Sequence, residues 1–115
     1  MSKTEVAILQ AFGAAEEFLP YKAEGLFITD IFFFIRRYSL LSHAPLLSEL
    51  IQEATRMVNK GLLDTMYSKR VEGGEELMYF ISEKGKNVLE GLDSYSDSFY
   101  ITKAVTDVRR SLRKA

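Results

Sequence analysis

The sequence predicts a mainly α, α+β fold in which three helices precede a two-stranded β-hairpin and two helices follow it. One observation is an amphipathic helical pattern over residues 45–60, and another is a pair of β-prone runs separated by Gly73 and Gly74. A third is that helical patterns lie on both sides of these elements. The chain has 115 residues, of which 47% are hydrophobic and 27% charged, so we expect one globular domain over residues 1–115.

The N-terminal segment, residues 4–19, is expected to form the first helix. Its apolar side chains recur at helical spacing over a broad face, and Pro20 disfavours a helical conformation in the residue before it. Glu16 and Glu17 interrupt the apolar stretch, which therefore lacks the long apolar region of a signal peptide. The most apolar run, residues 26–35, is shorter than the roughly 20 residues that cross a membrane. We therefore expect no membrane span.

Residues 26–41 form the next predicted element. Five consecutive large apolar residues fit either a buried helix or a buried strand. We favour a central helix, because Thr29 or Asp30 could cap its start and because Arg36 and Arg37 suit a helix C-terminus. A helix that is apolar on all sides belongs at the centre of a core or at a subunit interface.

The segment after the turn at residues 42–45 is expected to form an amphipathic helix. Pro45 suits its first position, and Gly61 is placed to end it. Its apolar stripe consists of Leu47, Leu50, Ile51, Ala54 and Val58. Its other face carries polar side chains, which are Ser48, Glu49, Gln52, Thr55, Arg56, Asn59 and Lys60. A solvated face or a binding face would both have this composition.

Residues 62–82 are expected to form the hairpin, with strands over residues 62–71 and 76–82. The two glycines between β-prone runs are typical of a hairpin connection. Ser82 is placed to cap the next helix, so residues 83–114 are expected to hold two C-terminal helices. The last of these has an apolar side formed by Ile101, Val105, Val108 and Leu112.

Three short motifs in this region carry a family resemblance. They are Asn-Lys-Gly-Leu-Leu at residues 59–63, Ser-Lys-Arg at residues 68–70 and Tyr-Phe-Ile-Ser-Glu-Lys-Gly-Lys at residues 79–86. Over residues 46–92 the chain resembles the winged-helix regulators grouped around MarR, SarA and PadR. The resemblance implies a winged helix-turn-helix with a two-stranded β-wing, and N- and C-terminal helices that pair two subunits.

The resemblance also raises an expectation about the helix-turn-helix within residues 26–60. The family places a full helix and a turn between its central helix and its recognition helix. If residues 26–41 are that central helix, only residues 36–45 remain for both. We therefore expect a helix-turn-helix that is compressed or merged with the central helix.

The resemblance implies that the polar face of the helix at residues 46–60 enters the major groove of DNA, with the wing beside it. The side chains on that face can donate to and accept from base edges and phosphates. The DNA-binding residues implied in this way are Ser48, Gln52, Thr55, Arg56, Asn59 and Lys60 on the helix, and Lys69 and Arg70 at the base of the wing. Glu49 and Glu53 oppose this interpretation, because carboxylates are repelled by phosphates.

Composition restricts the chemistry open to the chain. It has no cysteine and one histidine, His43. His43 is expected in a turn, where a histidine is more often an exposed residue without a role than a functional one. We therefore expect no metal site and no cofactor, and with no catalytic motif we expect no enzymatic activity. The absence of cysteine suits a cytoplasmic protein.

We accordingly predict a homodimeric, sequence-specific regulator of transcription that binds double-stranded DNA. A net charge of −1 permits DNA binding without favouring it, because phosphate attraction depends on local charge. Two alternatives stay open at this point. One is a winged-helix module that binds proteins and not DNA, and the other is a plasmid or phage accessory factor that binds DNA.

Overall fold

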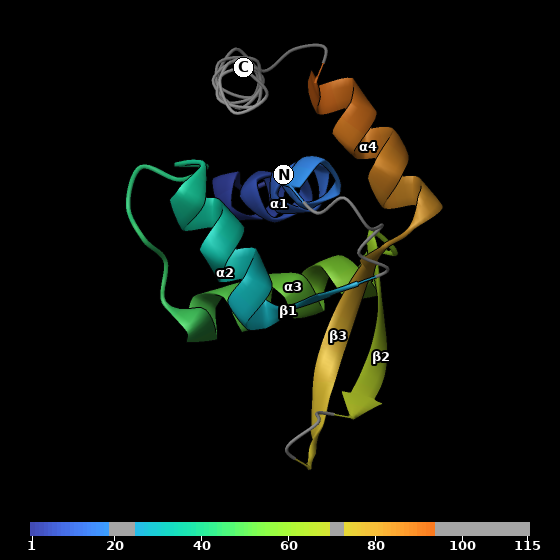
Figure 1. Cartoon of the computed structure of the whole chain (residues 1–115). Helices are drawn as coiled ribbons and strands as arrows, with labels where there is room; N and C mark the ends of the chain where they lie inside the picture. The colour runs from blue at the N-terminus through green and yellow to red at the C-terminus, as the bar shows by residue number, and fades with distance from the viewer. Residues whose placement is uncertain (19–24, 70–72, 94–115) are drawn as a thin grey trace, which may run out of the picture.

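A computed structural model of the chain describes residues 1–18, 25–69 and 73–93. The elements are, in order, α1 (Lys3–Phe18), β1 (Leu26–Phe27), α2 (Ile28–Arg37), α3 (Leu47–Asn59), β2 (Leu63–Lys69), β3 (Glu75–Ile81) and α4 (Glu83–Asp93). The predicted α+β order, with a hairpin after three helices, is confirmed. Figure 1 shows the hairpin of β2 and β3 projecting well beyond the helices, past α3. The predicted last helix lies outside the described residues.

Helix α1 is the centre of the core. Five consecutive residues, 7–11, are each less than 5% exposed, so the helix is covered on every side. We predicted this position for residues 26–41, and that prediction is wrong. Helix α2 buries Ile31, Phe34 and Ile35 on one side, whereas Phe33 is 48% exposed. The aromatic run of α2 is therefore divided between the core and the surface.

Strand β1 occupies two residues that we predicted to be helical. Leu26 pairs with Tyr79 and Phe27 with Met78, which makes a three-stranded antiparallel sheet in the order β1-β3-β2. A strand of two residues is too short to show the alternation that identifies strands in a sequence. The start of α2 is also different from the prediction, because Asp30 lies in the first turn and its Oδ2 accepts the Phe27 N–H at 3.0 Å.

The helix-turn-helix consists of α2, the connection of residues 38–46 and α3. It is neither compressed nor merged with another helix. Helix α1 takes the place of the central helix, and α2 is the first helix of the motif, so our assignment of the helices was displaced by one. Pro45 is buried and lies two residues before α3, which begins at Leu47 and not at the proline.

Gly61 ends α3 as predicted. Its φ angle is +77°, in the left-handed region that favours glycine. The Leu62 N–H donates to the carbonyl of Met57 at 2.9 Å, and the Gly61 N–H donates to the carbonyl of Val58 at 3.0 Å. This pair of bonds is the Schellman arrangement, which satisfies carbonyls at a helix C-terminus.

Helix α4 begins after Ser82, as the sequence predicts. The Ser82 Oγ accepts the Gly85 N–H at 3.0 Å and donates to the Gly61 carbonyl at 2.6 Å. The Ser82 N–H donates to the Leu62 carbonyl at 3.1 Å, and the Lys84 Nζ donates to the Lys60 carbonyl at 2.9 Å. Three successive carbonyls after α3 are thus bonded to the start of α4. The Ser-Glu-Lys-Gly motif therefore has a structural role here.

Candidate nucleic-acid interface

Helix α3 is held by three buried side chains, which fix the direction in which its polar face points. Leu50, Ala54 and Met57 are each 0% exposed and pack against the core. The spacing of three and four residues places them on one side of the helix. The opposite side therefore faces solvent along the whole length of α3.

Most of the predicted DNA-binding residues of α3 lie together on this solvent-facing side. Ser48, Gln52, Thr55 and Asn59 are all exposed, and they recur at spacings of three and four residues. The Thr55 Oγ1 donates to the Ile51 carbonyl at 2.8 Å, so its lone pairs remain able to accept a bond. The face thus offers hydroxyl and amide groups in a single row.

Arg56 stands at the edge of the same face and is paired with an acidic neighbour. Its Nη1 lies 2.7 Å from the Glu53 Oε1, with 64% of the Arg56 side chain exposed and 18% of the Glu53 side chain. A guanidinium has five N–H donors, so one bond to Glu53 leaves others for an outside acceptor. Glu53 therefore orients Arg56 while compensating part of its charge.

Lys60, the last predicted residue of this helix, points to the body of the protein. Its Nζ lies 3.2 Å and 2.9 Å from the two carboxylate oxygens of Glu5, which is only 5% exposed. The ion pair ties the C-terminus of α3 to the start of α1. The prediction that Lys60 contacts DNA stays a prediction, but its ammonium already has a partner in the folded chain.

The pKa of Glu5 records this pairing. Burial by itself would raise the pKa, but hydrogen bonds from Lys60 and Ser2 and the positive charge of Lys60 lower it below its usual value. Because the folded-state pKa is lowered, the stabilisation is present above the unfolded-state pKa. It is lost as the pH falls through the folded-state pKa.

We therefore expect Glu5→Gln to lower the free energy of unfolding at neutral pH by about 1 kcal/mol, since a charged hydrogen bond is lost. The difference between wild type and variant should shrink as the pH falls through the lowered pKa of Glu5, because the carboxylate then becomes protonated. Urea unfolding at neutral and acidic pH measures both values. A difference that stays constant with pH would contradict the pairing.

Lys69 lies at the end of β2, in the projecting hairpin. In the register of the sheet it is directly opposite Glu75, which partly compensates its charge. Lys69 follows Leu63 by an even number of residues in β2, so both side chains point to the same face of the sheet, and Leu63 is buried there. Lys69 is exposed. Arg70, the other predicted residue of the wing, lies outside the described residues.

Two exposed apolar residues of α3 were missed as surface residues. Leu47 and Ile51 are 42% and 45% exposed, although we placed both in the core stripe. Met57, which we left out of that stripe, is fully buried. Six apolar residues of α3 cover too wide an arc to be buried together. In a helical projection Ile51 lies about 80° from the centre of the row from Leu50 to Ala54, so its exposure could have been predicted. Leu47 lies only about 40° from that centre, as buried Met57 does, and it is exposed at the first residue of the helix, which a projection does not show.

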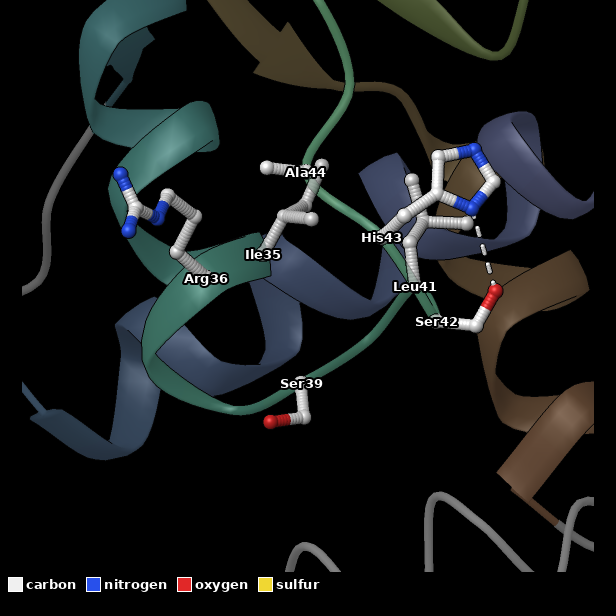
Figure 2. Close-up of a pocket in the computed structure, with 7 residues that line it drawn as sticks. All are labelled: Ile35, Arg36, Ser39, Leu41, Ser42, His43 and Ala44. Carbon is white, nitrogen blue, oxygen red and sulfur yellow. Dashed lines mark hydrogen bonds between the residues drawn. The ribbon is translucent and has the colours of Figure 1, made fainter.

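A shallow pocket of about 220 Å³ lies beside the connection between α2 and α3. It is lined by Ile35, Arg36, Ser39, Leu41, Ser42, His43 and Ala44. Figure 2 shows the guanidinium of Arg36 and the imidazole of His43 on opposite sides of this lining, with a hydrogen bond of 3.2 Å between Ser42 Oγ and His43 Nδ1. The side chains of Arg36 and His43 do not converge in the pocket, and His43 is exposed as expected for a turn residue.

The described residues, 1–18, 25–69 and 73–93, also bear on metal binding and membrane insertion. Among those residues, no group of three or more His, Asp or Glu side chains could hold a metal ion. No helix within the same ranges is long and apolar enough to cross a bilayer.

The three-helix core, the hairpin after α3 and the exposed face of α3 define a winged-helix fold. Two solved structures are similar to the chain over most of their length. A PadR-like transcription factor from Bacteroides fragilis has a TM-score of 0.60 and 18% sequence identity, covering 90% of this chain and 87% of that chain. A protein provisionally described as a transcriptional regulator from Thermoplasma acidophilum has a TM-score of 0.51 and 13% identity, covering 93% of this chain and 92% of that chain.

These similarities confirm the predicted winged-helix fold, which the chain shares with a PadR-like structure. The resemblance to the MarR and SarA groups stays a prediction. No protein-family model matches the chain, and no curated protein is similar to it in sequence. At such low identity the likeness defines the fold alone.

Proposed function

We propose that this chain is a transcriptional regulator that binds double-stranded DNA with sequence specificity and without catalysing a reaction. The observation that carries the proposal is the solvent-facing row of Ser48, Gln52, Thr55 and Asn59 on α3, with Arg56 at its edge. An α-helix fits the major groove, where amide and hydroxyl side chains can read base edges. The two similar solved structures, both described as transcriptional regulators, agree with this proposal.

The hairpin supports a second contact with the duplex. It projects past α3, and exposed Lys69 lies near its end, so the wing could reach a phosphate while α3 lies in the groove (Figure 1). Phosphate contacts set the position of a protein on DNA, whereas base contacts specify the sequence. We therefore assign Arg56 to sequence discrimination and Lys69 to overall affinity.

We propose further that two copies of the chain bind together. Helix α1 is already covered within one copy, so it offers little surface to a second copy. In helix α4 the side chains of Val88, Leu89 and Leu92 are only partly buried. Helix α4 is therefore a better candidate than α1 for the surface that pairs two copies. A twofold dimer would bind a roughly palindromic site with half-sites about one helical turn apart. Sedimentation equilibrium would give twice the chain mass.

DNA binding can be tested by fluorescence anisotropy on a random duplex pool and on the duplexes selected from it. We expect the logarithm of the affinity to fall steeply and linearly with the logarithm of salt concentration. Arg56→Ala should weaken binding to the preferred sequence by about 1–3 kcal/mol and should reduce the discrimination between that sequence and others. Lys69→Ala should weaken binding to all sequences alike, and it should reduce the slope of log affinity against log salt concentration by about one.

Lys86→Ala is a matched control, because it removes an exposed cation that pairs with Glu83 within α4 and belongs neither to the polar row of α3 nor to the strands of the hairpin. It should leave affinity and salt slope unchanged. Equal behaviour of all three variants would contradict the assigned residues.

A second candidate function is a winged-helix module that binds a protein. The exposed Leu46, Leu47 and Ile51, together with exposed Glu49, favour it. Absence of binding to any duplex at low salt would support this candidate and contradict the first. An accessory role on plasmid or phage DNA would give the same binding results as a regulator, and only the position of the preferred sites would distinguish them.

A further inference from the structure

The candidate DNA-reading face of α3 includes an apolar edge. Leu47 and Ile51 are four residues apart and stand in one row with Thr55, whose hydroxyl bonds to the Ile51 carbonyl. Neither side chain is required by the core, since Leu50, Ala54 and Met57 already fill the buried side of the helix. Their exposure therefore calls for an explanation that the polar row does not supply.

The apolar edge is small. Leu46, Leu47 and Ile51, which are 65%, 42% and 45% exposed, together offer roughly 200 Å² of apolar surface. A stable protein interface buries roughly 800 Å² on each partner. An edge of this size is thus insufficient by itself for a protein partner, but two side chains of this size are sufficient to contact individual groups within a groove.

We propose that Leu47 and Ile51 contact the C5-methyl groups of thymines, so that the half-site carries thymine at the positions below them. This inference rests on the proposed function. The thymine methyl is the apolar group that base pairs present in the major groove, and apolar side chains recognise it. An aliphatic side chain facing any other base edge would desolvate polar groups without pairing them.

The neighbours of Ile51 fit such a site. Gln52 is the next residue and is exposed, and a glutamine can make two hydrogen bonds to adenine in the major groove. Ile51 is β-branched, so it has little rotamer freedom in a helix and presents a fixed surface. The combination favours A·T pairs beneath the N-terminal half of α3. Arg56, nearer the C-terminal end, is suited to guanine.

The test uses a duplex selected from a random pool, in which each thymine is replaced in turn by deoxyuridine. Deoxyuridine lacks only the methyl group and keeps the pairing edge. For the wild-type protein we expect one or two positions at which the replacement weakens binding about three- to fivefold, the effect of burying one methyl-sized group. In Ile51→Ala or Leu47→Ala, the replacement at one of those positions should have no further effect.

Met66→Ala is the matched control. Met66 is 62% exposed but lies on β2, so this variant should keep the wild-type sensitivity to deoxyuridine at every position. Both α3 variants should fold, because the substituted side chains are exposed, and unfolding measurements on each verify this. Sensitivity to deoxyuridine that persists unchanged in both α3 variants would overturn the inference.

The outcomes separate the two proposals. Specific binding that no deoxyuridine replacement weakens would overturn the thymine contacts and leave the DNA-binding function in place. Absence of binding to every duplex would overturn the proposed function itself. If the chain bound no DNA but bound a protein in a way that depends on Leu47 and Ile51, the apolar edge would be part of a protein interface.

Discussion

Leu50→Ala is expected to lower the free energy of unfolding by about 3 kcal/mol, whereas Ile51→Ala should lower it by less than about 1 kcal/mol. The two residues are adjacent in α3, yet Leu50 is 0% exposed and Ile51 is 45% exposed. Removing Leu50 leaves a cavity among α1, α2 and α3, while the space left by Ile51 is filled by water. Urea unfolding of both variants measures the difference.

Truncation to alanine at the neighbouring position makes Ile51→Ala the control for Leu50→Ala. Alanine favours the helix over both residues, somewhat more over β-branched isoleucine, by a few tenths of a kcal/mol. The much larger difference expected between the two variants therefore reports burial. Equal losses would mean that α3 is rotated about its axis relative to the structure. Such a rotation would also remove the basis for assigning the polar row to the surface.

Gly85→Ala is expected to lower the free energy of unfolding by about 3 kcal/mol, a large effect for a single methyl group. A Cβ at Gly85 would clash with the backbone carbonyl oxygen of Leu62 and would lie 2.9 Å from the Ile81 Cγ1. Relief of the clash requires α4 to move away from the chain that follows α3. The Gly85 N–H bond to Ser82 would be strained by the same movement.

Gly91→Ala, in the same helix, is the control. No atom of the described residues lies within 4 Å of a Cβ at Gly91, so alanine should raise the free energy of unfolding by about 0.5–1 kcal/mol through its better helix propensity. Thermal or urea unfolding distinguishes the two signs directly. A destabilisation of both variants by the same amount would indicate that the effect comes from the helix and not from the contact with Leu62.

The sequence predicted the parts of the fold that depend on local signals. Gly61 ends α3 and Ser82 starts α4, because a positive φ angle and an N-terminal cap each favour few residue types. The hairpin followed from Gly73 and Gly74, whose φ angles are both positive. For the candidate site, local periodicity was sufficient to place Ser48, Gln52, Thr55 and Asn59 on one face.

The parts that could not be predicted depend on contacts distant in sequence. Strand β1 exists because Leu26 and Phe27 meet β3, some fifty residues later, and no periodicity marks it. The burial of α1 on every side depends on which helices surround it. The Lys60–Glu5 ion pair joins residues far apart in the chain, so the residue type alone predicted only an exposed cation.

The bonds between residues 60–62 and the start of α4 have a mechanical consequence. If α4 tilted alone, the carbonyls of Lys60, Gly61 and Leu62 would lose their donors, and the loss of several hydrogen bonds at once resists such a tilt. Helix α4 and the end of α3 should therefore move together as one rigid unit. In a dimer held by α4, a change in the angle between the two protomers would be passed directly to the separation of the two α3 helices.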